Sequence, residues 1–452
     1  MISFVSTFPP IICGIGTYMH YILEHIPRNH CKVISFKLNE FSTSDEALTP
    51  DLKARVDYCL SFPHPVLPSL SENDLLWFQH AFGMWGNVND HFLGLLEEAK
   101  RRGNKVAASF HTIHFQSEET PSGMNRKEEE LLRETLPLVD ALTVFTNGAH
   151  RAVLEAFPEY AKKIVVLRHG VHQYPKVSQK EARKRFFSYL VNQAEIPLFQ
   201  KRELSEAEDY FHSRNSILLG NYGFITSDKS PLQLHELGRL VQEKLPRYRV
   251  ITLFAGIIQR NKNTKLETNL PILEALRSSH DGKDNFFFEL YIPEDIFPMA
   301  FRALDFAVFW CNNATQSGRL AHAQGTGAFV VGRDWEGIGE TLKLSDLPAG
   351  ESLSELAETI AELVLEPSLK KEVSSQSWRY AQRYSFANQA KKHLLIEKAL
   401  ANGIDLPAID GEDIEDIRDW NWGGIYESRQ SRQTQPETPQ SLLASGIHGT
   451  SR

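Results

Sequence analysis

A polar loop that ends at Gly318 holds the residues best suited to contact a phosphate group. It follows a buried-strand run at residues 306–310 and leads into a short helical pattern and a second strand run. Thr315 or Ser317 can cap that helix, since a hydroxyl oxygen accepts hydrogen bonds from free backbone N–H groups. Gln316 lies in the same turn. Free N–H groups at the carboxyl edge of a sheet bind phosphate, although an ordinary βαβ crossover has the same pattern.

A glycine-containing loop after the first strand run is a second candidate for ligand contact. Gly14 and Gly16 permit a tight turn and the close approach of a ligand to the backbone. The loop is not the dinucleotide-binding fingerprint, because Met19 stands where that spacing requires a third glycine. A simple turn that closes a βα unit is the alternative interpretation.

Histidines follow several strand runs in the first half of the chain, and ligands gather at such strand ends in parallel sheets. His80 begins a loop of aromatic residues and glycines that suits a sugar, with a buried, hydrogen-bonded core position as the alternative. His111 is placed to contact sugar hydroxyls or to act as a base. His169 ends the last strand of this half, and therefore is expected at the rim of a cleft. We expect His114 to be peripheral.

The elements that must position these residues alternate regularly along the chain. Short apolar runs separated by helical patterns predict parallel sheets covered on both faces. The expected strands of the first half lie at residues 2–5, 32–36, 74–79, 105–110, 141–145 and 164–168. Those of the second half lie at 216–220, 248–256, 286–291, 305–310 and 328–332. The pattern predicts an α/β fold of two Rossmann-like, doubly wound domains that face a cleft.

The expected domain boundaries follow the change in pattern. The first domain covers residues 1–172, a linker with a helix at 179–191 and an insertion covers 173–214, and the second domain covers 215–384. Two long helices, near 368–384 and 386–401, end the folded part, and the second of them is expected to return to the first domain. An extension to residue 430 holds Trp420 and Trp422 and is expected to pack on a surface. Residues 431–452 are rich in Gln, Pro, Ser and Thr, which predicts a disordered tail.

Composition excludes several classes of partner and setting. The 452 residues carry a net charge of −8, which argues against a nucleic acid or an anionic membrane as the main partner. No apolar run reaches the roughly 18–20 residues of a membrane span, and the first residues lack the basic region of a signal peptide. The cysteines are scattered without metal-ligand spacing, which predicts a reducing, cytoplasmic setting.

Two Rossmann-like domains admit sugar transfer, phosphorolysis, epimerisation or simple binding, so the loops must discriminate between them. These loops, in their order along the chain, resemble those of the GT-B glycosyltransferases of family 4, in the bacterial branch with a Gln-His-Glu-Phe-Gly loop. The matching segments lie at residues 9–17, 79–86, 111–112, 140–146, 169–171, 220–225, 229–231, 291–293, 303–305, 332–340 and 384–386. The resemblance covers about residues 1–400.

The resemblance implies a GT-B fold whose first domain faces the acceptor and whose second domain binds a nucleotide diphosphate sugar. It implies sugar transfer with retention of the anomeric configuration, to a glycan, lipid-linked or small-molecule acceptor. His111 and Lys229 are the candidate catalytic residues, and Lys229 corresponds to the family's donor-phosphate lysine. The expected donor site comprises Gly14, Gly16, Lys229, Thr315, Gln316, Ser317, Gly318 and His322. The expected sugar or acceptor side comprises His80, His111 and His169.

No Asp-x-Asp motif occurs, so the sequence requires no bound metal, and we expect no cofactor besides the donor substrate. The chain departs from the family pattern at several positions. The arginine expected shortly before Lys229 is absent, and Ala81 stands in place of a glutamate. The two glutamates that flank the donor loop in the family are replaced by Ala314 or Thr315 and by His322.

These departures keep other functions open. One alternative is a non-catalytic GT-B module that binds a glycan or a protein partner, and a weaker one is a sugar phosphorylase. Turnover of a bound donor distinguishes an enzyme from a binding module, and dependence on inorganic phosphate distinguishes a phosphorylase from a transferase.

Overall fold

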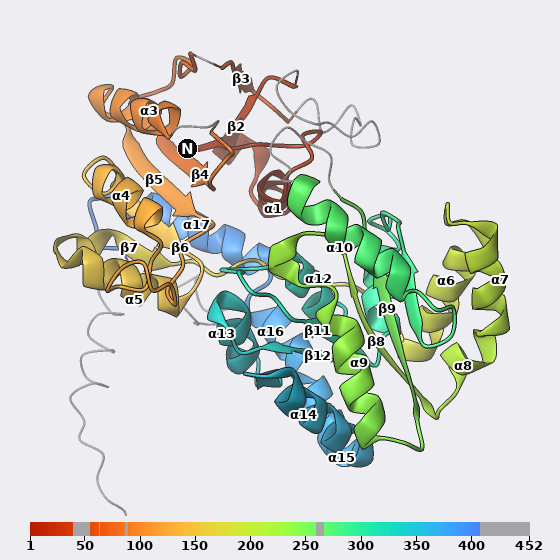
Figure 1. The fold of residues 1–452 in the computed structure, drawn as a ribbon. Helices are drawn as coiled ribbons and strands as arrows, with labels where there is room; N and C mark the ends of the chain where they lie inside the picture. Colours follow the sequence, from red (N-terminus) through yellow and green to blue (C-terminus); the bar gives the residue numbers. More distant parts are fainter. Residues whose placement is uncertain (39–54, 63, 86–88, 259–265, 407–452) are drawn as a thin grey trace, which may run out of the picture. The chain divides into compact units, whose positions relative to one another are not determined.

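The structure is a computed structural model that describes residues 1–38, 55–62, 64–85, 89–258 and 266–406 (Figure 1). Met1–Gly411 form one compact unit. The predictions for Trp420, Trp422 and residues 431–452 lie outside the described residues, as does Gly86, the last residue of the matching segment 79–86. Within the described part of the chain, none of the helices is both long and apolar enough to cross a membrane.

The first half of the chain forms a sheet of seven parallel strands in the order β3-β2-β1-β4-β5-β6-β7 (Figure 1). The order reverses beside β1, which is the doubly wound arrangement that the alternating pattern predicts. The strands are β1 (Ile2–Val5), β2 (Cys31–Phe36), β3 (Tyr58–Leu60), β4 (Leu75–His80), β5 (Lys105–Phe110), β6 (Ala141–Val144) and β7 (Ile164–Val166). This sheet and its covering helices are called the first lobe below.

The second half repeats the arrangement in a sheet of six strands, in the order β10-β9-β8-β11-β12-β13. The strands are β8 (Ser216–Tyr222), β9 (Arg249–Ala255), β10 (Asn285–Phe288), β11 (Phe306–Phe309), β12 (Val330–Arg333) and β13 (Ala349–Gly350). This sheet and its covering helices are called the second lobe. The two parallel-sheet α/β halves predicted from the sequence are confirmed.

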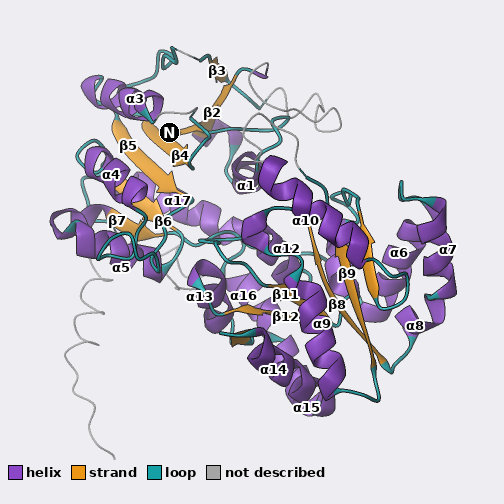
Figure 2. Ribbon diagram, in the orientation of Figure 1, coloured by secondary structure: helices purple, strands orange, loops and turns teal. Residues whose placement is uncertain are grey.

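Helices lie on both faces of each sheet (Figure 2). Those of the first lobe are α1 (Gly14–Leu23), α3 (Asp90–Arg101), α4 (Arg126–Thr135) and α5 (Asn147–Ala156). The following segment holds α6 (Gln179–Asn192), α7 (Leu198–Glu206) and α8 (Glu208–His212). Those after β8 are α9 (Gln233–Lys244), α10 (Leu266–Ser279), α11 (Phe297–Ala303), α12 (Gly318–Gly325), α13 (Glu336–Leu344), α14 (Leu353–Leu365), α15 (Pro367–Ser374), α16 (Gln376–Arg383) and α17 (Phe386–Ala401). Short 3₁₀ turns are η1 (Arg28–His30), η3 (Pro158–Lys163) and η4 (Ser227–Lys229).

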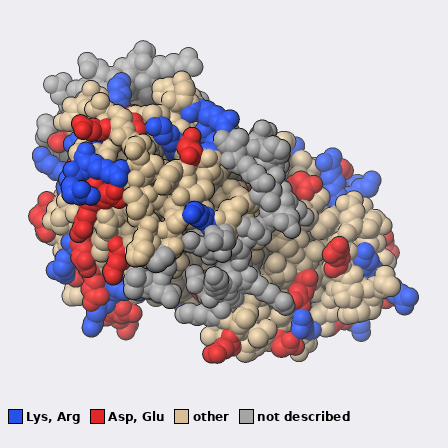
Figure 3. All heavy atoms as spheres, turned by 90° about the horizontal axis from the view of Figure 1, so that it is seen from above, with Lys and Arg blue, Asp and Glu red and all other residues tan. Residues whose placement is uncertain are grey.

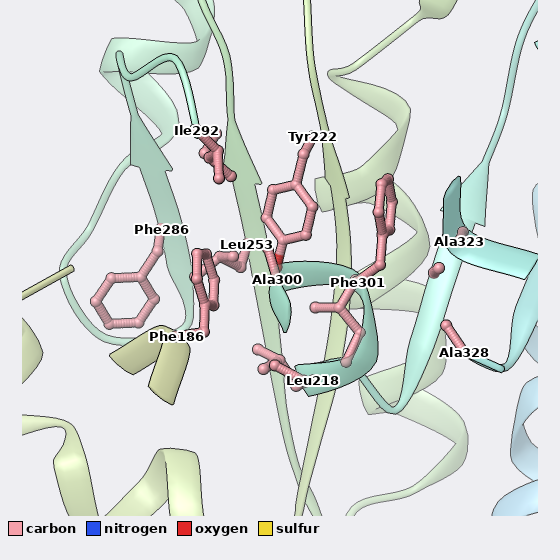
Figure 4. Close-up of a cluster of buried hydrophobic side chains, with 14 of the residues drawn as sticks. Phe186, Leu218, Tyr222, Leu253, Phe286, Ile292, Ala300, Phe301, Ala323 and Ala328 are labelled. Atoms are coloured by element: carbon pink, nitrogen blue, oxygen red, sulfur yellow. The ribbon is translucent and has the colours of Figure 1, made fainter. Parts of the chain in front are cut away.

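The segment between the lobes is part of the second lobe's core and is more than the predicted linker with one helix. Phe186 of α6 lies edge-on to Tyr222 of β8, with ring centroids 5.5 Å apart, and Phe301 of α11 lies 5.2 Å from the same ring (Figure 4). Phe211 of α8 is buried in the same cluster. The Lys, Arg and Glu residues of this segment suggested a polar linker with one helix and an insertion, whereas its apolar side chains, among them Leu190 and Leu204, are buried in the core.

A second correction concerns the end of the fold. The single long helix predicted near residues 368–384 is two helices, α15 and α16, which meet at Ser375. Strands β3 and β13 and helix α13 were also missed. The strands have 3 and 2 residues, too few to show a periodic pattern.

Helix α17 crosses back to the first lobe, as predicted. Its residues Phe386 and Ile396 are buried in the same apolar cluster as Phe4 and Trp77 of the first sheet. The chain begins beside this helix, because the Met1 amino group lies 3.1 Å from the Glu397 carboxylate. In Figure 1 the blue helix α17 lies among the elements of the first lobe. The return of the chain ties the two lobes together.

Charge is mixed on the face seen in Figure 3, where Lys and Arg side chains alternate with Asp and Glu over the described residues. The described part of this face therefore lacks the broad basic surface that nucleic-acid binding requires.

Candidate functional site

Two adjoining pockets lie between the lobes. The first, here called the aromatic pocket, has a volume of about 400 Å³ and includes Tyr21, Phe224, Tyr291 and Phe297 in its wall. The second, here called the polar pocket, has a volume of about 660 Å³ and includes Thr112, His114, Thr226, Asn269 and Asn313. Both share Lys229, Gln316, Ser317 and Arg319. The shared residues make one continuous cleft with a junction between the two pockets.

The N-terminus of helix α12 lies at this junction. Ser317 caps the helix, since its hydroxyl accepts a hydrogen bond from the Leu320 N–H at 3.3 Å. Thr315, the other predicted cap, instead donates its hydroxyl to the His111 carbonyl at 2.9 Å and so links the two lobes. The backbone at Gly318 is open, because a Cβ built there has only His169 Nε2 as a neighbour, at 4.0 Å. The positive end of the helix dipole therefore faces accessible space.

Two positively charged side chains, those of Lys229 and Arg319, lie at the same junction as this helix end. Lys229 is the last residue of η4, and Arg319 is the second residue of α12. Burial, and next to it the charge of Arg319, lowers the pKa of Lys229 to about 8. Burial also lowers the pKa of Arg319. Among the described residues no carboxylate forms an ion pair with either cation, and Asp228 acts on both only at longer range. Two partly buried positive charges without a carboxylate partner among the described residues mark a site for an anion.

His111 lies at the polar pocket, directly after β5. Its Nε2 lies 2.7 Å from Oε1 of Gln79, while Nδ1 is buried without a partner. Burial lowers the pKa of His111 well below its usual value, so the ring is neutral at pH 7. With Nε2–H donating to the side-chain amide oxygen Oε1 of Gln79, Nδ1 is left with an unused lone pair. His111 is suited to accept a hydrogen bond, and not to carry a charge.

His169 and His322 lie in the wall of the aromatic pocket. His322 Nδ1 is 2.6 Å from the Tyr174 hydroxyl, and its ring stacks on that of His172 with centroids 4.0 Å apart. Burial, followed by the effect of His169, lowers the pKa of His322 to about 3. Burial lowers the pKa of His169 to about 4. The position where the family pattern has an acid therefore carries a neutral, fixed imidazole.

The structure does not bring every predicted residue to these pockets. His80 is fully buried, with its ring 4.7 Å from that of Phe110 and its Nε2 3.3 Å from Asn89 Oδ1. It is a core residue, the alternative considered for it. Gly16 packs its backbone against Phe8, whereas Gly14 lies in the wall of the aromatic pocket. Neither His80 nor Gly16 is in the wall of either pocket.

His114, expected to be peripheral, lies in the polar pocket and joins the lobes. Its Nδ1 is 2.6 Å from the buried Glu128 carboxylate, and its Nε2 is 2.5 Å from Asn313 Oδ1 in the second lobe. Burial alone would lower the pKa of His114, but the hydrogen bond and charge of Glu128 raise it to about 9. The sequence signal was the capping box of Asn125 and Glu128, which places the carboxylate at the start of α4.

The His114–Glu128 pair predicts a specific dependence of stability on pH. The folded-state pKa of His114, about 9, exceeds the unfolded value of about 6.5. The pair's stabilisation is therefore complete below about pH 6.5 and is lost as pH rises through 9. His114→Gln should lower the free energy of unfolding by about 1.5–3 kcal/mol at pH 6, the range for a hydrogen bond to a charged group. Urea titrations at pH 6 and pH 9.5 measure this, and a difference between the proteins that does not shrink with pH would contradict the assignment.

Further hydrogen bonds close the cleft beside the polar pocket. The Glu340 carboxylate of α13 accepts from Asn147 N at 2.6 Å and Gly148 N at 2.8 Å, the first residues of α5. It also pairs with the buried Arg168 at 2.8 Å. Glu336 accepts from the Phe115 N–H at 3.2 Å. Helix α13 of the second lobe is therefore tied directly to the first lobe.

Comparison with known proteins identifies the fold. No protein-family model and no curated protein matches the sequence. Among solved structures, Anabaena HepE in complex with UDP matches with a TM-score of 0.59 at 14% identity, over 89% of this chain and 99% of that one. The α,α-trehalose 6-phosphate synthase of Burkholderia multivorans matches with a TM-score of 0.63 at 11% identity, over 89% and 97% of the two chains. The trehalose-6-phosphate protein of E. coli bound with UDP-2-fluoro glucose has a TM-score of 0.61 at 13% identity, over 88% and 98%.

The fold is GT-B. The fold class predicted from the loops is thereby confirmed, including the helix that returns to the first domain. Membership of family 4 stays a prediction, since the matching structures include trehalose-phosphate synthases. The junction of the two pockets lies in the cleft between the two lobes of this fold.

Proposed function

We propose that the protein is a glycosyltransferase that moves a sugar from a nucleoside diphosphate sugar to a hydroxyl group of an acceptor. The proposal rests on one observation. Lys229 and the open N-terminus of α12 lie at the same junction, between an aromatic and a polar pocket. A donor of this kind has an aromatic end, a diphosphate and a polyhydroxylated end in that order. The HepE structure holds UDP, and the E. coli structure holds UDP-2-fluoro glucose.

The nucleoside is assigned to the aromatic pocket. Tyr21, Phe224 and Phe297 offer ring surfaces there, and the segment after β10, Leu290 to Ile292, runs along the same wall. Flat rings bind a nucleobase by stacking and by exclusion of water. Exposed backbone along such a segment supplies the donors and acceptors that orient the base.

The sugar is assigned to the polar pocket, where several buried polar atoms lack partners. They are Nδ1 of His111, Oγ1 of Thr112, Oγ1 of Thr226 and Oε1 of Gln316. Buried polar atoms are nearly always hydrogen-bonded in folded proteins, so unpartnered ones beside a cavity indicate a polar ligand. The hydroxyl groups of a sugar are both donors and acceptors and would satisfy this set.

The diphosphate is assigned to the junction. In the transfer the bond between the anomeric carbon and the phosphate oxygen breaks, and a bond to the acceptor oxygen forms. Negative charge then accumulates on the leaving diphosphate, where the Lys229 ammonium and the backbone N–H groups of Gln316 to Gly318 stabilise it. Such preorganised donors act most strongly in a cleft that excludes water.

The proton of the acceptor hydroxyl passes to the leaving diphosphate in this proposal. His111, His169 and His322 are weak bases, since burial lowers the pKa of each ring. His114 is already protonated at pH 7. A phosphate oxygen that gains charge as the donor bond breaks is the stronger base at this place. Transfer on that face of the sugar retains the anomeric configuration.

Replacement of His111 tests whether the sugar binds in the polar pocket and the nucleoside in the aromatic pocket. His111→Ala should lower turnover by about 10-fold or more, as expected for a lost hydrogen bond to the sugar. It should leave the affinity for the free nucleoside diphosphate within about twofold, because that ligand does not enter the polar pocket. Steady-state kinetics and calorimetric titration measure the two effects. If His111→Ala lowered the affinity for the free nucleotide as much as it lowered turnover, His111 would contact the nucleotide and not the sugar.

A non-catalytic GT-B module is the second candidate, favoured by Ala314 or Thr315, and by His322, at the two positions where the family pattern has acids. Incubation with a panel of nucleotide sugars, with and without mixed sugar and glycan acceptors, separates the two functions. Donor consumption with a new glycoside product supports the transferase. Saturable binding without any consumption supports the module, and consumption only with inorganic phosphate supports a phosphorylase.

A further inference from the structure

We infer that Arg319 is the second cation that holds the donor diphosphate, supplied from helix α12 itself. The inference rests on the proposed function and goes beyond it in naming the residue. In the family pattern an arginine stands shortly before the donor lysine, but here residues 224–228 contain none. The structure places a guanidinium in the same cleft by another route.

The first support is position. Arg319 and Lys229 both lie in the walls of both pockets, and their charges influence each other. They come from different elements, Lys229 from the 3₁₀ turn η4 after β8 and Arg319 from the first turn of α12. A diphosphate bound at the junction would therefore contact both cations as well as the helix end.

The second support is that the guanidinium is held in place by neutral groups. Nη1 of Arg319 donates to Asn221 Oδ1 at 3.2 Å and to the Tyr222 carbonyl at 3.0 Å. The Asn221 amide is itself fixed, because its Nδ2 donates to the Val308 carbonyl at 2.5 Å. The thiol of Cys311 is a further hydrogen-bond partner. These acceptors are fewer than the five N–H donors of a guanidinium, so donors remain for an anion.

The third support is the glycine beneath the side chain. Gly223 has a φ of +125°, and a Cβ built on it would lie 2.6 Å from Arg319 Cδ. A glycine is required both by this backbone conformation and by the passage of the arginine stem. The end of β8 is therefore shaped to let Arg319 reach the junction, which a chance surface arginine would not need.

The alternative role is structural, a tie between β8 and α12, and the two roles differ in how the loss depends on phosphate. Arg319→Met should weaken binding of a nucleoside diphosphate by about 10- to 100-fold, the effect of removing hydrogen bonds from a charged donor. The loss should be smaller for the monophosphate and absent for the free nucleoside. Arg319→Lys should give an intermediate loss, since a lysine keeps the charge but not the planar fork.

Arg302→Met is the matched control. Arg302 is a part-buried arginine of the same lobe that donates to the Val177 and Gly327 carbonyls, and it is in the wall of neither pocket. The Arg302→Met variant should be less stable than wild type but should bind the nucleotide with wild-type affinity. Gly223→Ala, which keeps both cations but crowds the Arg319 stem, should reproduce the phosphate-dependent loss in part.

The measurement is calorimetric titration of each full-length variant with the nucleoside, monophosphate and diphosphate of the base that wild type prefers among uracil, guanine, adenine, cytosine and thymine. A loss equal across the three ligands, or no loss, in both Arg319→Met and Arg319→Lys overturns the role of Arg319. Wild type that binds none of the diphosphates contradicts the proposed function instead. If Arg319→Met does not fold, Arg319→Lys and Gly223→Ala decide the question by the same comparison.

Discussion

Replacing Lys229 with alanine should weaken the binding of the nucleoside diphosphate and lower turnover by roughly 10²-fold or more, the scale of losing a strong donor to a developing anion. Lys229 lies at the junction beside the open end of α12, without an ion-pair partner among the described residues. Its removal leaves a dianionic leaving group with Arg319 and backbone N–H groups alone. Titration with the diphosphate and initial rates of donor consumption measure the two losses.

The same residue predicts a dependence of binding on pH. The Lys229 pKa of about 8 lies below the usual value because burial disfavours the charged form. Diphosphate affinity of the wild type should therefore fall as pH rises above 8, and the Lys229→Ala protein should lack that fall. Lys283→Ala, at an exposed lysine outside both pockets, serves as the control. A folded Lys229→Ala protein with wild-type affinity and turnover would remove Lys229 from the site.

Replacing Gly318 with valine should abolish nucleotide binding while the protein remains folded. The first methyl group fits, since a Cβ at Gly318 meets only His169 Nε2, at 4.0 Å. The two further methyl groups of valine would occupy the space in which phosphate oxygens approach the N–H groups of α12. The melting temperature should fall by no more than about 4 °C, because a cost of roughly 1 kcal/mol has about that effect in a domain of this size.

Two other glycine variants make this prediction sharper. Gly318→Ala adds only the first methyl group and should weaken binding less than valine does. Gly94→Val, on an exposed face of α3 with no atoms near a built Cβ, reports the effect of a valine in a helix away from the cleft. Wild-type nucleotide affinity in Gly318→Val would place the phosphate elsewhere.

The alternation of buried runs and helical patterns was sufficient to predict both sheets and most of their helices. Strand β4 shows why, since all its residues are buried and its first four, residues 75–78, form a continuous apolar run. The capped start of α12 was also predictable, because Ser317 directly precedes the first turn and hydroxyl caps have a local cause. Structural features that depend on residues close together in the sequence could therefore be predicted from the sequence.

The residues that were missed depend on contacts between distant segments. Arg319 follows a glycine in an ordinary helical turn, and only the tertiary meeting with Asn221 and Lys229 gives it a place in the cleft. His114 is held by the local pair with Glu128, but its contact with Asn313 of the second lobe could not be predicted from neighbouring residues. His80 shows the opposite case, because its loop matched a sugar-binding pattern while the aromatic rings around it keep the side chain in the core.

His322 stands where the family pattern has a glutamate, and it lies in the wall of the aromatic pocket. A carboxylate at this position would accept hydrogen bonds from a ligand at two oxygens. The imidazole is held by the Tyr174 hydroxyl on one nitrogen and stacked on His172, so at most one ring nitrogen remains for a ligand. In the proposed function this change alters what the aromatic pocket recognises, while the two cations and the helix end remain at the junction.

Thermal unfolding of wild type and of Lys229→Ala with nucleoside diphosphates and their sugar conjugates tests the proposed donor site. A ligand at 100 times its dissociation constant stabilises the folded state by roughly 2.7 kcal/mol. At least one diphosphate or its sugar conjugate should raise the melting temperature of wild type, and the rise should be lost in Lys229→Ala. The absence of a shift with every such ligand at millimolar concentration, or an equal shift in both proteins, would contradict the proposed donor site.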